Sequence, residues 1–236
     1  MKWLRLIGLS VAFSLLAFSD NFSHTEIISY TVNLQKQDLQ LYWKDDKGQI
    51  IGNFKNLQSL LKKNHRELVF AMNAGMYRKD QSPQGLFIQQ RKTKAPIDNG
   101  NGSGNFYLKP NGVFYWVGKK AHVVKTEDFR MKNNIDFATQ SGPMLVIDGK
   151  IHSAFKEGST NLNIRNGVGI LPDGTIVFAL SKTETNFYDF AKYFQELGCK
   201  NALYLDGFVS RMYLPEKKWV QTDGSFGVMI GVTKKR

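Results

Sequence analysis

The chain has 236 residues, 42% of them hydrophobic and 13% aromatic, and its formal net charge at pH 7 is +12. This length suits one domain or at most two small ones, the composition can bury a core, and a single cysteine, Cys199, excludes an intramolecular disulfide. The basic charge favours anionic partners, but the lysines are scattered and no nucleic-acid-binding motif is present, so nucleic acid is not an expected partner.

Residues 1–19 are typical of a secretory signal peptide. Two basic residues precede an apolar run from Leu6 to Phe18, and Ala17-Phe18-Ser19 places small residues where a signal peptidase reads them. The run is shorter than the roughly 20 residues that a membrane-spanning helix needs. We therefore predict cleavage before Asp20 and a periplasmic mature chain with no stable membrane span. An uncleaved anchor is the alternative.

Most of the mature chain, residues 20–236, has the pattern of short strands separated by turn signals. In chain order, strands are predicted over residues 26–33, 39–43, 68–72, 86–88, 106–108, 113–117, 144–147, 150–155, 168–171, 175–180, 204–206, 219–220 and 228–232. Hairpins are predicted at Asn111-Gly112, Asp148-Gly149 and Asp173-Gly174, because these dipeptides favour tight turns between strands.

Two segments have the apolar periodicity of amphipathic helices, over residues 54–63 and 187–197. The second has Asn186 as a helix N-cap, Asp189 in its first turn and Gly198 just beyond its end. Strands dominate and hairpins outnumber crossovers. We therefore predict an α+β fold, a single domain with a mixed, largely antiparallel sheet, hairpins and two or three helices.

Polar residues and glycine interrupt the apolar pattern beside four of the predicted strands. The four segments are Asn73-Ala74-Gly75, Gln140-Ser141-Gly142-Pro143, Asn163-Ile164-Arg165-Asn166-Gly167, and Asp206-Gly207 followed by Ser210. Glycine at such a position permits the close approach of a ligand. Ordinary turn chemistry is the alternative for any one of these segments taken alone.

Taken together, the four segments resemble the phosphodiester glycosidase family. The resemblance rests on Asn73-x-Gly75, on Ser141 to Gly149, on Arg165 to Ile170 and on Leu205-Asp206-Gly207, in this order and spacing. It extends over about residues 66–232 and implies a glycosidase, a hydrolase that cleaves sugar-1-phosphodiesters, in a bacterial periplasmic branch of the family. Many members continue with Gly-Gly-Ser-Ser after Asp-Gly, whereas this chain continues with Phe208-Val209-Ser210-Arg211, which leaves the sugar specificity open.

The residues themselves suggest how such a bond is cleaved. The leaving group is a phosphate monoester with a second pKa near 6, which needs little protonation, so one carboxylate can replace the usual pair. We predict Asp206 as the nucleophile or water-activating base and Arg165 as a bidentate phosphate clamp. Asn73 can donate to phosphate or sugar, and backbone N–H groups can form an anion-binding concavity. The predicted substrate-binding residues are Asn73, Gly75, Ser141, Gly142, Asn166, Gly207 and Ser210.

Alternatives remain open for several of these residues. Arg165 can instead pair with Asp206 as a structural ion pair, and Glu184 is the next carboxylate to consider. His152 lies in an apolar run, which favours a structural role over a catalytic one. No histidine has metal-ligand spacing, so neither a metal nor a cofactor is predicted. The expected partner is an anionic, phosphate-bearing glycan, and the second functional class is a non-catalytic binder of anionic glycans or envelope components.

Overall fold

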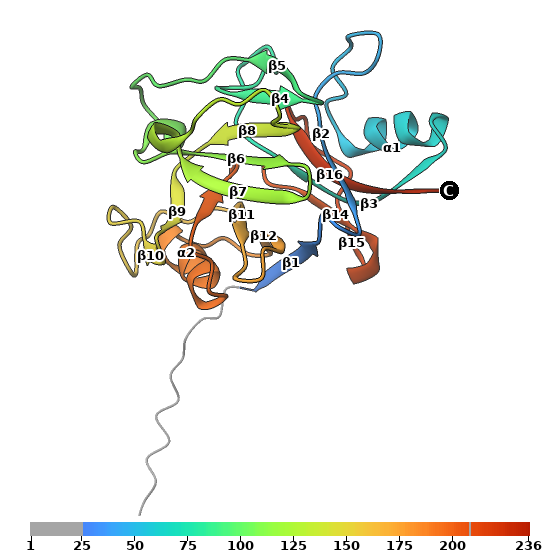
Figure 1. Ribbon diagram of the computed structural model, residues 1–236. Helices are drawn as coiled ribbons and strands as arrows, with labels where there is room; N and C mark the ends of the chain where they lie inside the picture. Colours follow the sequence, from blue (N-terminus) through green and yellow to red (C-terminus); the bar gives the residue numbers. More distant parts are fainter. Residues whose placement is uncertain (1–25, 208) are drawn as a thin grey trace, which may run out of the picture.

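A computed structural model describes residues 26–207 and 209–236 of the chain (Figure 1). The predicted signal peptide, residues 1–19, lies outside the described residues. Within the described residues, the strands form three sheets and every strand pairing is antiparallel. No helix in this part of the chain combines the length and the apolar character needed to cross a membrane.

Each sheet combines strands that are distant in the sequence. The first sheet has the order β1 (Ile27–Val32), β12 (Ile176–Ser181), β11 (Asn166–Ile170), β13 (Ala202–Tyr204), β9 (Met144–Ile147) and β10 (Lys150–Ile151). The second has the order β15 (Trp219–Val220), β14 (Met212–Leu214), β3 (Arg66–Asn73), β16 (Met229–Lys235) and β2 (Asp38–Tyr42). The third has the order β5 (Lys92–Ala95), β4 (Phe87–Gln89), β8 (Phe137–Ser141), β6 (Gly112–Val117) and β7 (Lys120–Lys125).

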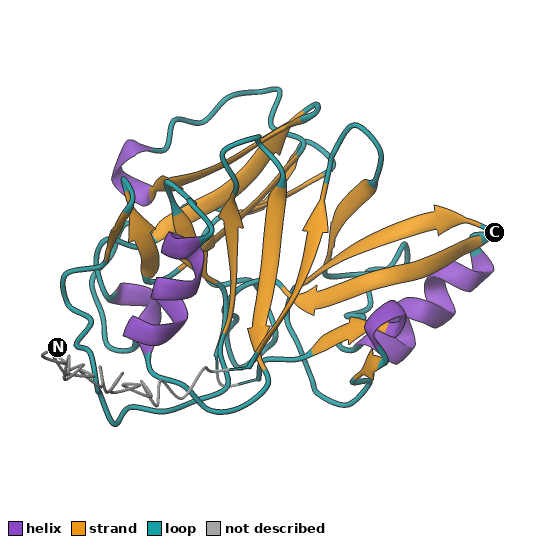
Figure 2. Cartoon of the chain, turned by 90° about the horizontal axis from the view of Figure 1, so that it is seen from below, coloured by secondary structure: helices purple, strands orange, loops and turns teal. Residues whose placement is uncertain are grey.

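Both predicted α-helices are present, and each begins at an asparagine N-cap. Helix α1 (Phe54–Lys63) begins after Asn53, whose side chain accepts a hydrogen bond from the Asn56 backbone N–H at 2.8 Å. Helix α2 (Phe187–Glu196) begins after Asn186, which accepts from the Asp189 N–H at 2.9 Å. The two helices lie at opposite ends of the molecule (Figures 1 and 2).

The structure confirms a sheet-rich chain with antiparallel pairing and two α-helices, but the predicted single mixed sheet is replaced by three sheets. The hairpin at Asp148-Gly149 is confirmed, with φ of 48° and 78° as a type I′ turn requires. The hairpin predicted at Asn111-Gly112 is wrong. Strand β6 pairs with β7 across Gly118-Lys119 instead, and the short helix η1 (Asn105–Tyr107) replaces the strand predicted at 106–108. The Asn111 side chain is buried and donates to the Phe106 carbonyl, which holds this segment as a loop.

One phenylalanine from each sheet meets the others in a shared hydrophobic core. Phe178 of β12 lies between Phe70 of β3, at a ring-centroid distance of 5.3 Å, and Phe114 of β6, at 5.9 Å. All three side chains are fully buried within one cluster. Because aromatic pairs add specific geometry to the burial of large apolar surfaces, this trio fixes how the sheets sit against one another.

We expect Phe178→Ala to lower the free energy of unfolding by about 3–5 kcal/mol, because it removes the ring that contacts two sheets and leaves a cavity. Urea unfolding followed by circular dichroism measures the loss. Val220→Ala, at a side chain that is 54% exposed, is the control and should change stability by less than about 0.5 kcal/mol. A similar small loss for both variants would show that the three sheets do not depend on this contact.

Candidate active site

The four polar segments singled out in the sequence meet where strands of all three sheets end. Asn73 is the last residue of β3, Ser141 the last of β8 and Asn166 the first of β11, while Asp206 follows β13 by two residues. All four residues are buried, and the most exposed of them, Asp206, is 7% exposed. The fold therefore gathers polar residues from the second, third and first sheets around one backbone segment, Leu205-Asp206-Gly207.

Two asparagine side chains and the Asp206 backbone form a closed ring of hydrogen bonds. Asn166 Nδ2 donates to Asn73 Oδ1 at 2.9 Å, and Asn73 Nδ2 donates to the Asp206 carbonyl at 3.2 Å. The Asp206 N–H completes the ring by donating to Asn166 Oδ1 at 2.8 Å. Strand β13 has ended at Tyr204, so the amides satisfy backbone groups that no longer belong to a sheet.

Two serines hold the same segment from other directions. Ser141 Oγ donates to the Leu205 carbonyl, and Ser210 Oγ donates to the Asp206 carbonyl at 2.6 Å. Both serines are buried. Their hydrogen bonds, like those of the two asparagines, position the backbone that carries the Asp206 carboxylate. Substrate contact by any of these side chains stays a prediction.

The glycines of the motifs are required by close packing of protein atoms. A Cβ at Gly75 would lie 2.7 Å from Thr139 Oγ1, and a Cβ at Gly142 would lie 2.6 Å from the Cβ of Asn111. A Cβ at Gly207 would lie only 1.3 Å from the Tyr204 hydroxyl oxygen. Every larger residue at 207 would therefore displace either the Tyr204 ring or the backbone next to Asp206.

Arg165 is held rigidly against the same tyrosine. Its Nε donates to the Thr185 carbonyl and its Nη2 to the Asn161 carbonyl, both at 2.8 Å, and its Nη1 lies 3.5 Å from the Tyr204 hydroxyl. The guanidinium carbon stacks 3.6 Å from the ring centroid of Phe187, the first residue of α2. The side chain is 1% exposed, and this burial lowers the pKa of the guanidinium while the Tyr204 hydroxyl raises it.

Tyr204 lies within the influence of both charged residues of the predicted mechanism. Burial raises the pKa of its phenol well above the usual value, the Arg165 charge opposes that rise and the Asp206 charge adds to it. The phenol therefore stays neutral at physiological pH and keeps a proton to donate. The half-buried Tyr77 also senses Asp206, because burial and then the Asp206 charge raise the pKa of Tyr77. Sequence reasoning missed both tyrosines. The only indication in the sequence was the residue type itself, because a buried phenol usually needs a hydrogen-bond partner.

The other candidates from the sequence lie in less suitable surroundings. His152 is buried, its Nε2 lies 3.0 Å from the Lys109 carbonyl, and its Nδ1 accepts from the Ala154 N–H at 3.1 Å. Burial lowers the pKa of His152, so the ring is neutral at physiological pH. Glu184 is exposed in the loop before α2. Among the described residues, no three His, Cys, Asp or Glu side chains gather as metal ligands.

The family model for phosphodiester glycosidase matches residues 66–232, a span that contains every residue of the site. The chain therefore belongs to the phosphodiester glycosidase family. An Escherichia coli K12 protein described as "Uncharacterized protein YigE" is 38% identical over 208 residues, which cover 88% of this chain and 82% of that protein.

Two solved structures share the fold at low sequence identity. The catalytic domain of zebrafish N-acetylglucosamine-1-phosphodiester alpha-N-acetylglucosaminidase, auto-inhibited by its pro-peptide, superposes with a TM-score of 0.52 at 15% identity, covering 87% of each chain. A hypothetical protein from Synechocystis superposes with a TM-score of 0.57 at 14% identity and covers 88% of this chain. The present chain spans 59% of that longer Synechocystis chain.

The hydrogen-bond ring predicts strong coupling between Asn73 and Asn166. We expect each single change to alanine to cost about 1–3 kcal/mol of unfolding free energy, because each leaves buried groups without partners. The double variant should lose at least about 0.5 kcal/mol less than the sum, since the second change removes a partner already lost. Urea unfolding of the four proteins gives this coupling energy. Asn73→Ala combined with Val220→Ala is the control and should be additive, and additivity in both pairs would contradict a cooperative ring.

Proposed function

We propose that this chain is a hydrolase that cleaves sugar-1-phosphodiesters, with Asp206 as nucleophile or water-activating base. The observation that carries the proposal is the support of Asp206, whose backbone is bonded by Asn166, Asn73 and Ser210 at the junction of three sheets. A carboxylate carried by a backbone segment that is fixed in this way needs little reorganisation during the reaction, which is what efficient catalysis by a single group demands.

In this proposal, Arg165 compensates the phosphate charge of the substrate. Its guanidinium is buried, so water screens its charge poorly and the charge acts over several ångströms. The bonds to Thr185 and Asn161 fix its orientation, and the neutral Tyr204 hydroxyl lies between this cation and the Gly207 backbone. Donors oriented in advance can stabilise the departing phosphate without a second carboxylate.

We further infer that the substrate is a phosphate-bearing glycan of the envelope or of external origin, met in the periplasm. The net charge of +12 supports an anionic substrate, and the leader-like residues 1–19 support export. The alternative is a binder of anionic glycans that uses the same site without turnover. Turnover of sugar 1-phosphodiesters by the purified mature protein, followed as released reducing sugar, separates the two functions.

We expect Asp206→Asn to lower kcat on such a substrate by roughly 10²–10⁴-fold, because an amide neither activates water nor forms a glycosyl ester. The amide is nearly isosteric with the carboxylate, and the backbone hydrogen bonds of residue 206 to Asn166, Asn73 and Ser210 can form in the variant, so the melting temperature should change little. Asp223→Asn, at an exposed carboxylate 2.8 Å from Arg211, is the matched control and should keep full activity. Activity retained in Asp206→Asn would move the catalytic carboxylate elsewhere, with Glu184 next to be changed.

Arg165→Lys should reduce kcat/KM for phosphodiester substrates by about 10–100-fold, as expected from charge-assisted contacts of about 1.5–3 kcal/mol. Lysine keeps the charge but cannot bond the Thr185 and Asn161 carbonyls at once while stacking on Phe187. Uncharged aryl glycosides should be affected much less. Arg91→Lys, at an exposed ion pair with Asp136, is the control. Equal losses on charged and uncharged substrates would show that Arg165 is only structural.

A further inference from the structure

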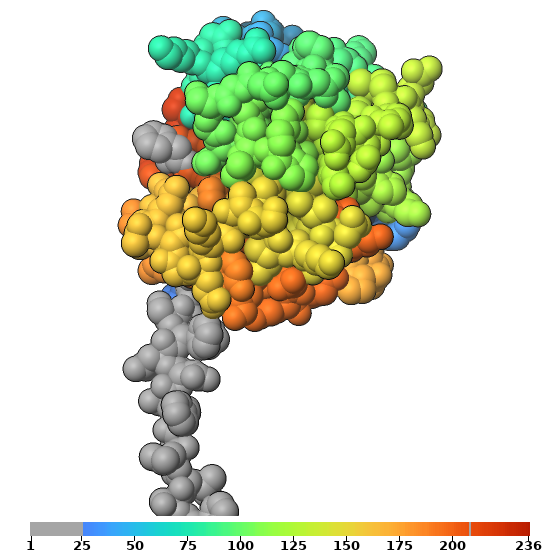
Figure 3. All heavy atoms as spheres, turned by 90° about the vertical axis from the view of Figure 1, so that its left-hand side faces the viewer, coloured from blue at the N-terminus to red at the C-terminus, as the bar shows by residue number. Residues whose placement is uncertain are grey.

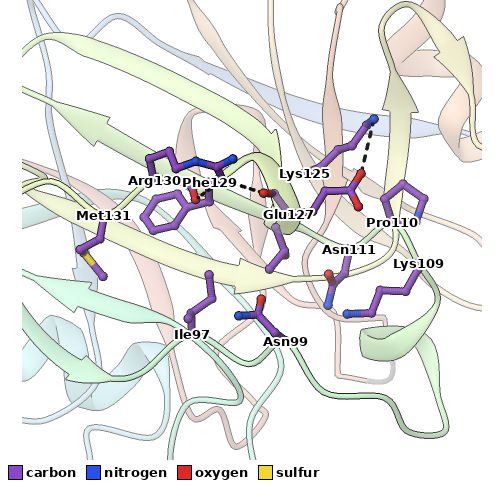
Figure 4. Close-up of a pocket in the computed structure, with 11 residues that line it drawn as sticks. Ile97, Asn99, Lys109, Pro110, Asn111, Lys125, Glu127, Phe129, Arg130 and Met131 are labelled. Atoms are coloured by element: carbon purple, nitrogen blue, oxygen red, sulfur yellow. Dashed lines mark hydrogen bonds and ion pairs between the residues drawn. The ribbon is translucent and has the colours of Figure 1, made fainter.

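A hollow, which we call the loop cavity, lies outside the candidate active site. It has a volume of about 830 Å³ and lies between the loop that precedes β6 and the segment that follows β7 (Figure 4). Cavities of roughly 300–1,000 Å³ are typical of sites for small ligands. None of the predicted catalytic or substrate-binding residues lines it. Its lining includes Asn99, from the glycine-rich stretch Asn99–Gly104, for which the proposed reaction has no use.

The floor of the loop cavity carries a buried polar atom without a partner. Asn111 is 1% exposed, and its Nδ2 donates to the Phe106 carbonyl at 3.0 Å. Its Oδ1 has no hydrogen-bond partner among the described residues. Figure 4 shows the Asn111 amide beside Lys109, facing the space that Asn99 borders. A buried acceptor left unsatisfied is unfavourable, so a slight turn of this side chain that lets a ligand hydroxyl or N–H reach Oδ1 would be favoured.

Cations also line the loop cavity. Lys109, Lys125 and Arg130 line the cavity, against one acidic lining residue, Glu127. Lys125 Nζ lies 3.7 Å from the Glu127 carboxylate and pairs with it. The charges of Lys109 and Arg130 are not compensated in this way, because neither residue belongs to an ion pair in the described part of the chain. Arg130 is nevertheless held in place, because its Nη1 donates to the carbonyls of Glu127 and Phe129. The cavity thus offers positive charge to an anionic group.

Part of the wall is apolar. Ile97, Phe129 and Met131 line the cavity, and Met131 is 52% exposed at its edge. On the face seen in Figure 3, the green surface of residues near 100 borders the yellow-green surface of residues near 130. A ligand that matches all of these features has an anionic group, a hydroxyl or N–H donor and a carbon face that packs on apolar side chains.

We propose that the loop cavity is a second binding site, which takes an anionic sugar unit such as a sugar phosphate. The unpaired charges of Lys109 and Arg130 attract the phosphate, a sugar hydroxyl donates to Asn111 Oδ1, and the ring packs on Phe129 and its apolar neighbours. The cavity adjoins the candidate active site, because Asn111 packs directly on Gly142, next to the Ser141 that holds Leu205. Binding here requires no catalysis, so it stands or falls independently of the proposed hydrolysis.

Two methionines make the two sites separately observable. Met131 lies at the edge of the loop cavity, whereas the half-buried Met76 follows Asn73 and Gly75 beside the candidate active site. In mature protein labelled with ¹³C at the methionine methyl groups, titration with glucose 1-phosphate should shift the Met131 signal in a saturable way. Inorganic phosphate and glucose, tested alone, should each bind at least tenfold more weakly, because each offers only part of the matching chemistry.

Charge removal then tests the assignment. The double variant Lys109→Gln, Arg130→Gln should weaken glucose 1-phosphate binding, read at Met131, by at least tenfold. Lys36→Gln with Lys55→Gln removes the same charge at exposed positions elsewhere and should change it less than twofold. A shift of Met76 without one of Met131 would place the ligand in the candidate active site alone and overturn the proposal. Equal affinity for inorganic phosphate would also overturn it, since the sugar would then contribute nothing.

Discussion

A strand that ends inside a protein leaves backbone groups that the sheet no longer pairs, and these groups must find partners. The site depends on how this constraint is met after Tyr204. The side chains of Asn73 and Asn166 take the place of neighbouring strands for Asp206, and they also bond each other. The polar residues Asn73 and Asn166 of the motifs are therefore required by the structure, independently of any role in binding a substrate. Removing either amide would destabilise the backbone segment that carries the Asp206 carboxylate, whether or not the amide also contacts a ligand.

The ring joins the first and second sheets, and Ser141 from the third sheet holds the neighbouring Leu205, so the site depends on how the three sheets pack against one another. The Phe70, Phe178 and Phe114 contacts join the sheets in the core. Strand β3 carries both Phe70 and the site residue Asn73. The strands that carry Asn166 and Ser141, β11 and β8, pair directly with the strands that carry Phe178 and Phe114, β12 and β6. The packing of the core phenylalanines and the position of the site residues therefore depend on the same rigid, paired strands. The burial that stabilises the core also strips water from Arg165 and Tyr204, which strengthens their electrostatic influence at the site.

Sequence patterns predicted the features that short-range physics determines. Helix α1 has the predicted bounds because its cap and apolar face lie within a dozen residues, and the turn at Asp148-Gly149 follows from two residues. Strand β8 was missed because its buried end, Thr139-Gln140-Ser141, is polar. Gln140 accepts hydrogen bonds from the distant Leu86 and Asp98 N–H groups, and such partners leave no periodic signal. The four motif segments were found, but not the hydrogen bonds that join them.

The chain contains four Asn-Gly pairs, which are the dipeptides most prone to spontaneous deamidation when the backbone is free to bend. Asn166-Gly167 is clamped in β11 between two neighbouring strands, so the attack of the glycine nitrogen on the side chain is geometrically hindered. Asn99-Gly100 and Asn101-Gly102 are exposed in a loop without such restraint. Chemical ageing should therefore begin there, adding negative charge beside a basic cavity while the buried amide ring stays intact.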